Sequence, residues 1–578
     1  MSFPDDLQIK LIEHSGNALV LGGPGSGKTT TALLKAKYLI RGLQPYQKIL
    51  FLSFSNSAII QIKSTLENFR ITFSKIEKSN IHILTYHAFC YDIIRNYAFL
   101  LGVKEKIKLF PPEILKCELA KNGIKKNSEE HKQYSFKVFK ERGLIEFDLF
   151  APVTLNILTK SDHACSLIQS LYPFIILDEF QDTNIQQSQI IYKLASKSTI
   201  ICLADRQQMI YTYVTGVDEK RIDEAIKILN PQKIDFENRN YRSKNIEVLR
   251  FGDNILSKSP QPIPRSIVFK YYRFNNQIST GLKSLIISIQ KDLLKRENIS
   301  TPTIALLTRT NKSTTYVSHQ LTATTGQLSF PIFHNIRNDE NDLVFCNRVL
   351  CRMLGITFLS VNECLSLILG EFSDWCFMNG SKSSIEKGKK LAEWAAKINR
   401  NQSVSVNIVR NLTQLLITIK TTVTGQIHLD VKSIINLCKP YSDEFLKRFN
   451  SYLSVANHFH PNSKLTLDVN DSYLSNGSYF ELLEKYESHA NRTRILDDDF
   501  SFHNIDVMNL YKVKGREYDA VIIFDGLHQF ALISDRDKKK PYDIKKVLRV
   551  AVTRARHSVA IYCNQGNASI NKEFFNIR

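Results

Sequence analysis

The sequence lacks the features that mark several specialised classes of protein. Its ten cysteines are scattered and form no CxxC pair, which argues against a disulfide framework or a structural zinc site. No apolar run approaches the roughly 18–20 residues of a membrane helix, so no membrane contact is expected. The mixed, acidic N-terminus does not resemble a signal peptide. These absences predict a cytoplasmic protein with reduced thiols.

Composition narrows the class further, because positive charge is in clear excess. Lys and Arg number 77 against 56 Asp and Glu, which gives a formal net charge of +21. Apolar residues make up 43% of the 578 residues and charged residues 23%, so a mainly disordered, collagen-like or coiled-coil chain is excluded. The charge favours a polyanionic partner, although it carries no information about the fold.

Short apolar runs that end in polar residues recur along the chain. Runs this apolar are typical of parallel strands covered on both faces. Helix-like stretches separate them, which predicts an α/β fold. The expected strands are Ala18–Leu21, Ile49–Phe54, Ile81–Thr85, Phe174–Leu177, Ile200–Leu203, Ile304–Thr308, Val507–Leu510, Ala520–Phe524 and Ala560–Cys563.

Two long helix-like regions interrupt this rhythm. The simplest organisation is two α/β cores, each interrupted by a mainly helical insert. Neither insert shows a nuclease carboxylate cluster or metal-ligand spacing, and the second is the expected seat of partner or substrate specificity. The expected segments are 1–91 and 166–238 for the first core, 92–165 for its insert, 239–337 and 496–578 for the second core, and 338–495 for its insert.

The segment GGPGSGKT, residues 22–29, fits the phosphate-binding pattern GxxxxGK[ST]. It follows an expected strand and opens an expected helix, which is the context that this motif requires. Lys28 is expected on the β- and γ-phosphates and the Thr29 hydroxyl on Mg²⁺. A Gly-rich turn without a ligand is the alternative. The candidate nucleotide-binding residues are Gly22, Gly23, Pro24, Gly25, Ser26, Gly27, Lys28, Thr29 and Thr30.

Two acids follow the expected strand at 174–177. An enzyme with this loop needs one carboxylate on the metal and another near the attacking water. Asp178 suits the metal role and Glu179 the catalytic role. Without the upstream motif, a solvated loop would be the better explanation of such a pair.

Further motifs, in a fixed order, resemble those of the UvrD/Rep-type DNA helicases of superfamily one. They are SFSN at 53–56, TYHAF at 85–89, DEFQDTN at 178–184, ADRQQMIY at 204–211, NYRS at 240–243, KGREYD at 514–519 and VTRA at 552–555. The resemblance implies a fold of two RecA-like cores. It also implies that the protein hydrolyses ATP and acts as an ATP-dependent DNA helicase. It also implies 3′-to-5′ movement on single-stranded DNA or a tailed duplex.

The resemblance assigns further nucleotide contacts. It places an adenine-reading glutamine at Gln8, a ring stacked on adenine at Tyr241 and a carboxylate near the ribose at Glu517. Gln208 stands where the family positions the γ-phosphate and the attacking water.

Two arginines of the second core are expected to reach across to the γ-phosphate. The resemblance places them at Arg242 and Arg554. Arginine suits this role because its charge is permanent and its donors form a planar fork. A catalytic arginine on the opposite core couples hydrolysis to domain closure.

Three aromatic residues fall where the family contacts single-stranded DNA. They are Phe54, His87 and Tyr213. Flat rings stack on unpaired bases and tolerate any base sequence. Packing in the core is the alternative for Phe54 and for Tyr213.

The sequence also departs from the family pattern. The family's WRG is replaced by YVT at 213–215, so an arginine that links the ATP and DNA sites is absent, and Arg206, Tyr511 and Arg549 are atypical. These changes leave open a second class of function, an ATP-driven sensing or regulatory subunit of a nuclease complex in antiviral defence, by analogy with Gabija. DNA repair and an RNA substrate also stay open, since no residue reads the 2′-hydroxyl.

Overall fold

The structure is a computed structural model that divides into two compact units. Unit 1 comprises Met1–Gly102, Phe150–Asn338 and Ser501–Arg578, and unit 2 comprises Val103–Leu149 and Asp339–Phe500. The residues that it describes are 5–23, 25–53, 56–67, 73–206, 209, 218, 220–236, 246–257, 259–324, 326–337, 341–453, 459, 461, 463–496 and 503–577. The six-part division expected from the sequence stays a prediction.

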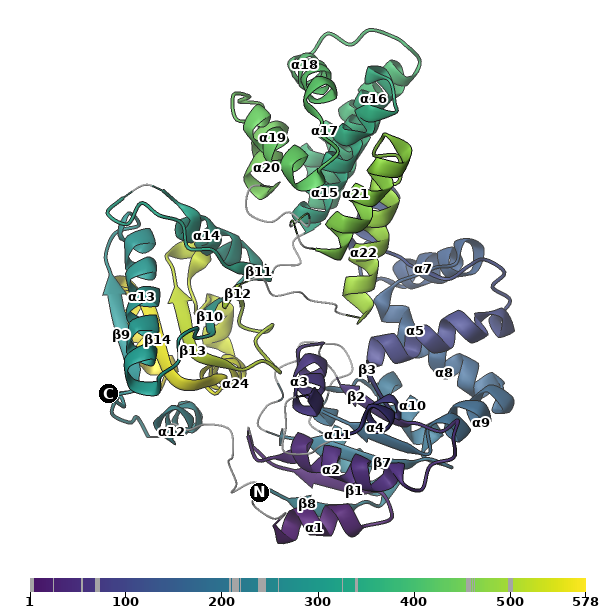
Figure 1. Cartoon of the computed structure of the whole chain (residues 1–578), viewed down its shortest axis with the longest axis vertical. Helices are drawn as coiled ribbons and strands as arrows, with labels where there is room; N and C mark the ends of the chain where they lie inside the picture. The colour runs from purple at the N-terminus through teal and green to yellow at the C-terminus, as the bar shows by residue number, and fades with distance from the viewer. Residues whose placement is uncertain are drawn as a thin grey trace. The chain divides into compact units, whose positions relative to one another are not determined.

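Unit 1 contains two parallel six-stranded sheets (Figure 1), so the predicted fold of two parallel-sheet cores is confirmed. The first sheet, in spatial order, consists of β3 (Ile81–Thr85), β2 (Ile49–Ser53), β6 (Phe174–Leu177), β7 (Thr199–Ala204), β1 (Ala18–Leu21) and β8 (Gln232–Asp235). The second consists of β11 (Asn335–Arg337), β12 (Ile505–Asn509), β10 (Ile304–Thr308), β13 (Tyr518–Asp525), β14 (Ala555–Asn564) and β9 (Ile267–Tyr272).

Helices cover the sheets because their central strands are apolar on both faces. Every residue of β10 and of β13 is buried, with one apolar cluster on each face of the second sheet. The helices of unit 1 are α1 (Asp6–Glu13), α2 (Lys28–Ile40), α3 (Asn56–Glu67), α4 (Lys75–Ser79), α5 (Tyr86–Tyr97), α8 (Phe150–Lys160), α9 (Asp162–Leu171), α10 (Ile185–Leu194), α11 (Arg221–Leu229), α12 (Ile246–Ile255), α13 (Gln277–Glu297), α14 (Asn311–Thr322), α23 (Asp535–Lys539), α24 (Pro541–Val552) and α25 (Ala568–Phe574).

Unit 2 is built mainly of helices around an apolar interior. Trp375 is completely buried there, and Ser360 and Gly380 begin and end its helix as an N-cap and a left-handed C-cap. Its elements are β4 (Lys108–Leu109), α6 (Pro112–Lys121), α7 (Glu129–Arg142), β5 (Leu144–Ile145), α15 (Asn341–Leu354), α16 (Val361–Asn379), α17 (Lys382–Asn399), α18 (Asn407–Thr422), α19 (Ile427–Cys438), α20 (Glu444–Leu453), α21 (Lys464–Asn476) and α22 (Leu482–Leu496).

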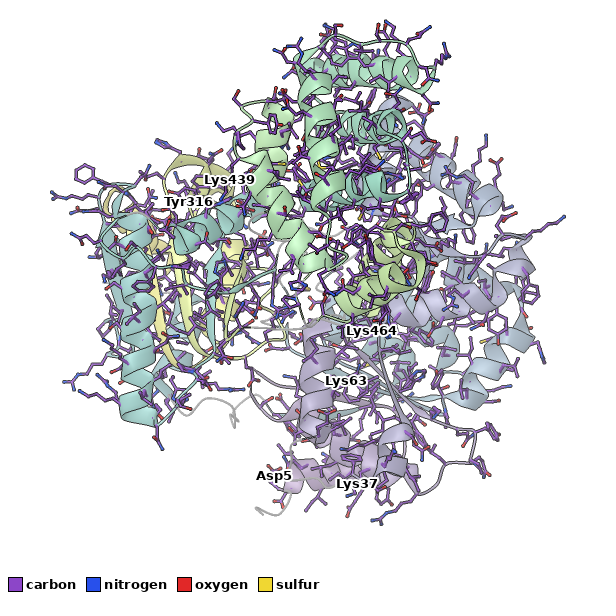
Figure 2. The ribbon with its side chains drawn as sticks, turned by 45° about the horizontal axis from the view of Figure 1, so that its top comes forward. Asp5, Lys37, Lys63, Tyr316, Lys439 and Lys464 are labelled. Atoms are coloured by element: carbon purple, nitrogen blue, oxygen red, sulfur yellow. The ribbon has the colours of Figure 1, made fainter. Side chains whose placement is uncertain are left out.

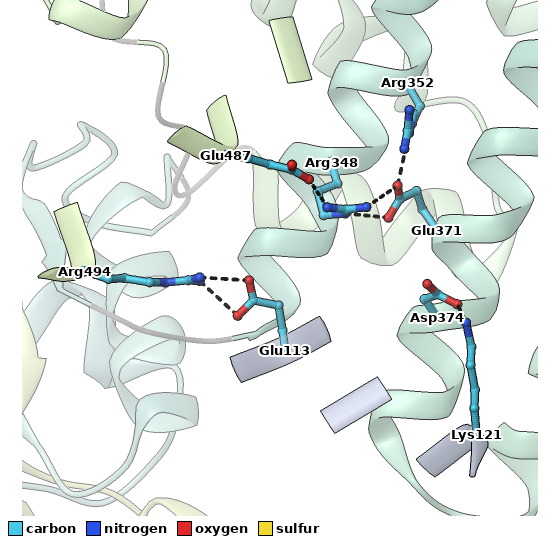
Figure 3. Close-up of polar contacts among 8 residues, drawn as sticks. All are labelled: Glu113, Lys121, Arg348, Arg352, Glu371, Asp374, Glu487 and Arg494. Atoms are coloured by element: carbon cyan, nitrogen blue, oxygen red, sulfur yellow. Dashed lines mark hydrogen bonds and ion pairs between the residues drawn. The ribbon is translucent and has the colours of Figure 1, made fainter. Parts of the chain in front are cut away.

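Ion pairs join the two chain segments of unit 2 (Figure 3). Glu113, which is 2% exposed, lies 3.0 Å from Arg494, and Lys121 lies 2.5 Å from Asp374. These pairs connect α6, from the first segment, to α22 and α16, from the second. Segments far apart in the sequence therefore fold as one compact body.

The structure bears on two of the expectations from the sequence, the one about cysteine thiols and the one about membrane-spanning helices. All ten cysteines are buried and unpaired. Within the described ranges, no helix combines the length and the apolar character that crossing a bilayer requires.

His334 should make the stability of the second core pH-dependent. Burial lowers the pKa of His334 below 6.5, and its ring contacts Ser318 Oγ at 2.7 Å and the Ile332 carbonyl at 2.9 Å. The unfolded chain binds a proton more readily, so the free energy of unfolding is expected to fall as pH drops below about 6.5. His334→Gln should reduce this acid-induced loss between pH 7.5 and 5.5 in chemical denaturation. An identical loss in both proteins would contradict the prediction.

Candidate nucleotide site

Gly22, Gly23 and residues 25–27 lie between β1 and α2, where the sequence predicts the phosphate-binding motif. Gly27 has a φ of 87°, a left-handed conformation that favours glycine. A Cβ on Gly22 would lie 2.5 Å from Ser26 Oγ, so the turn closes around a residue without a side chain. Among the described side chains, none caps the N-terminus of α2. The N–H groups of its first turn can therefore bind an anion.

Two side chains of this turn also fit a bound phosphate. Ser26 Oγ is buried and has no hydrogen-bond partner among the described residues, and an orphaned hydroxyl of this kind suits a phosphate oxygen. The Lys28 ammonium donates hydrogen bonds to the carbonyls of Gly22 and Gly23. Nucleotide binding would exchange these carbonyls for phosphate oxygens. Thr29 follows in the first turn of α2 and is partly buried.

Asp178 and Glu179 follow β6, at the same sheet edge as the turn after β1. Burial, together with the charge of Glu179, raises the pKa of Asp178 to about 7, against the opposing charge of Lys28. Burial would also raise the pKa of Glu179, but Lys514 and Lys28 outweigh it and lower this pKa to about 2. Glu179 is therefore ionised at neutral pH, as a carboxylate that orients water must be. Its φ of 54° marks local backbone strain.

Two residues for which the sequence predicts no role also reach these acids. Lys514 Nζ lies 3.1 Å from Glu179 Oε2 and forms a second ion pair with Asp182. Gln181 Nε2 donates to Glu179 Oε2 at 2.5 Å, while Gln181 Oε1 accepts from the Asp205 N–H at 3.0 Å. Their only sequence signal is their place inside the motifs DEFQDTN and KGREYD.

Arg554 is the described member of the predicted arginine pair. It is 2% exposed, and its Nε donates to the Val550 carbonyl at 3.1 Å, at the end of α24. Its positive charge acts on Glu179, in the same direction as the two lysines. The structure therefore places an arginine of the second core within electrostatic reach of Glu179 in the first.

Comparison with known proteins agrees with this geometry. The family model described as the UvrD/REP helicase N-terminal domain matches residues 5–137 and 118–220. The Bacillus subtilis protein YjcD, provisionally named an ATP-dependent DNA helicase, is 21% identical over an alignment of 642 residues that covers 98% of this chain and 80% of YjcD. Over residues 5–220, the chain therefore resembles the UvrD/Rep-type helicases.

Other members of the UvrD/Rep type match a shorter stretch. The ATP-dependent DNA helicase PcrA of Staphylococcus epidermidis is 25% identical over 295 residues, which cover 44% of this chain. PcrA of Staphylococcus aureus is 23% identical over the same length. This chain spans 39% of the length of both PcrA proteins.

The UvrD/Rep pattern predicts that the Gln8 side chain reads adenine. In the structure the same side chain also caps the N-terminus of α1. Gln8 Oε1 accepts from the Asp5 N–H at 3.2 Å, and Asp5 Oδ1 accepts from the Gln8 N–H at 3.0 Å. This capping box begins α1, and Figure 2 labels Asp5. The Nε2 amide of Gln8 is the group that a base would then meet.

Gln8→Glu separates the two roles, because glutamate preserves the capping box but lacks the amide donor. We expect the KM for ATP to rise about tenfold, the value of one hydrogen bond, and the preference for ATP over GTP to weaken. The midpoint of thermal unfolding should stay unchanged. Steady-state kinetics with both nucleotides test this, with Asp6→Asn on the same helix as the control. An unchanged KM would assign Gln8 to the cap alone.

The remaining predicted contacts divide between described and undescribed residues. His87, in the first turn of α5, is partly buried and meets the ring of Phe150 edge-on at 5.8 Å. Glu517 pairs with Arg556 at 3.2 Å. Thr30 is exposed. The roles of these residues stay predictions, and the following lie outside the described residues: Pro24, Phe54, Gln208, Tyr213, Tyr241 and Arg242.

Two departures from the UvrD/Rep pattern take part in polar contacts. Arg206, which replaces an acid, pairs with Asp223 at 2.7 Å. Tyr511, which replaces a histidine, accepts a hydrogen bond from Arg309 Nη1 at 2.8 Å. Both substituted side chains are therefore accommodated by local polar contacts.

Proposed function

We propose that the chain is an ATP-dependent DNA translocase and helicase that moves 3′-to-5′ along single-stranded DNA. The proposal is carried by the convergence of Lys514 and Arg554, from the second core, on Glu179, which follows a central strand of the first. Hydrolysis at such a seam is coupled to relative movement of the cores. The direction of movement rests on the family resemblance.

In this proposal each site residue has a defined task. Lys28 and the first turn of α2 bind the phosphates. Thr29 and Asp178 would hold Mg²⁺, which neutralises phosphate charge when bound. In the described part of the chain no cluster of three His, Cys, Asp or Glu is arranged for a metal. One carboxylate with phosphate oxygens is the usual Mg²⁺ arrangement. Glu179 orients water, and Arg554 stabilises charge on the γ-phosphate.

The charge distribution supports a nucleic-acid partner. Basic and acidic residues nearly balance in unit 2, so almost all of the excess positive charge lies in unit 1. A strand bound through its phosphates should show a log–log salt slope of about −0.7 per phosphate contacted. The stacking residues proposed for the strand are Phe54, His87 and Tyr213.

An unwinding assay on 3′- and 5′-tailed duplexes tests the function. We expect DNA-stimulated ATP hydrolysis and separation of the 3′-tailed duplex, with Lys28→Ala inactive in both. Equal activity of the wild type and Lys28→Ala would overturn the proposal. ATP hydrolysis without strand separation would favour the second candidate, a regulatory subunit that signals to a nuclease. Stimulation by RNA in place of DNA would redirect the substrate assignment.

A further inference from the structure

Lys514 occupies an unusual position for a residue of the second core. Its side chain is 3% exposed, and its ammonium lies between two carboxylates of the first core, Glu179 and Asp182. Asp182 is itself completely buried. A buried ammonium held between a buried acid and a partly buried one is stabilised only while all three groups stay together, because an isolated buried charge is costly.

A tight turn presents Lys514 from the second sheet. The turn lies between β12 and β13, and the Leu510 N–H bonds to the Thr308 carbonyl, which extends the sheet to its start. Val513 is completely buried, and Gly515 has a φ of 79°. The lysine is therefore anchored to the interior of the second core on both sides.

The first core also restricts Glu179, but incompletely. Its φ of 54° fixes the direction of the side chain, and Gln181 donates one hydrogen bond to Oε2. Asp178 and Asp182 place further acidic groups nearby, and these repel the Glu179 carboxylate. Lys514, from the second core, contacts Glu179 directly.

We infer that Lys514 is a positioning residue that orients Glu179 only while the second core is docked on the first. The inference rests on the proposed function and deepens it. Separation of the cores withdraws the ammonium, so Glu179 loses its ion pair and the attacking water loses its orientation. Domain position thereby controls the water-orienting carboxylate, in addition to the arginine expected at the γ-phosphate.

Steady-state ATP hydrolysis with and without a poly(dT) oligonucleotide tests this inference. Lys514→Met should lower kcat about 10²-fold while the KM for ATP stays within about threefold, since the lysine acts on orientation and not on nucleotide binding. Lys514→Arg should recover part of kcat because it restores the charge. Unchanged kcat in Lys514→Met would overturn the inference.

A matched control separates positioning from loss of stability. Lys283 is a completely buried lysine of the second core that donates to the carbonyls of Ala323, Leu328 and Phe330. Lys283→Met should lower the midpoint of thermal unfolding without lowering kcat in the remaining folded protein. An equal fall of kcat in both variants would overturn the inference, because it would trace the effect to stability.

A double-mutant cycle identifies the residue through which Lys514 acts. If it acts through Glu179, Lys514→Met combined with Glu179→Gln should be no slower than Glu179→Gln alone. Multiplicative losses would overturn the inference and leave the proposed function intact. A wild-type protein without DNA-stimulated hydrolysis would overturn the proposed function together with the inference.

Discussion

Replacing Arg554 with glutamine is expected to lower the kcat of DNA-stimulated ATP hydrolysis by about 10³–10⁵-fold. Arg554 is buried, and its charge acts on Glu179 of the first core. A fixed guanidinium at this position stabilises the charge that develops on the transferred phosphoryl group. Arg554→Lys should recover little, because an ammonium cannot form the planar fork. Single-turnover hydrolysis measures the loss at the chemical step.

A nearby arginine provides the control. Arg549, on α24, is also buried and pairs with Asp253 at 2.8 Å. Arg549→Gln should reduce thermal stability but leave kcat within a few-fold of the wild type. Binding of a fluorescent ATP analogue should survive in Arg554→Gln. If Arg549→Gln loses as much kcat as Arg554→Gln, the effect comes from the packing of α24 and not from a catalytic arginine.

Much of the fold follows from apolar runs in the sequence. All nine expected strands overlap observed ones, and four of them, including β1 and β6, have the expected bounds. The signal was strong because central strands of a parallel sheet are buried on both faces and must be continuously apolar. β13, in which every residue is buried, is the clearest case.

Three of the four edge strands of these two sheets escaped the same reasoning, and the exception is β3, which has the expected bounds. β8, β9 and β11 lie at the edges of their sheets, and none was expected. β8 has the sequence QKID, and only Ile234 in it is buried. An edge strand pairs on one side only and keeps contact with water, so its composition is mixed and the apolar-run signal disappears.

The nucleotide turn was predictable because its chemistry is local. Gly22, Gly27 and Lys28 lie within seven residues, and the flanking strand and helix confirm the context. The ion pair between Lys514 and Asp182 was not predictable from the sequence. It depends on how the two cores pack, and no periodic pattern in the sequence signals it. The pairing of Glu113 with Arg494 in unit 2 is hidden for the same reason.

Glu179→Gln is expected to lower kcat by about 10²–10⁴-fold with little change in the KM for ATP. The amide keeps the shape of the side chain, and its oxygen can still accept from Gln181, but it cannot take a proton from water. Glu179 also raises the pKa of Asp178, so its removal should bring the pKa of Asp178 down and should not lower stability.

Three measurements on Glu179→Gln decide between a catalytic and a structural carboxylate. Stopped-flow hydrolysis should show the loss at the chemical step, nucleotide binding should persist, and the thermal midpoint should equal or exceed that of the wild type. Glu146→Gln is the matched control, since Glu146 is a buried acid of unit 2 that lies 3.4 Å from His131. It should change stability alone.

Because Lys514 keeps its pair with Asp182 in Glu179→Gln, the seam should still close, and a protein that binds ATP and DNA but cannot turn over is the expected result. Near-normal turnover would show that Glu179 has no catalytic role. Lys514 would then have no catalytic carboxylate to position.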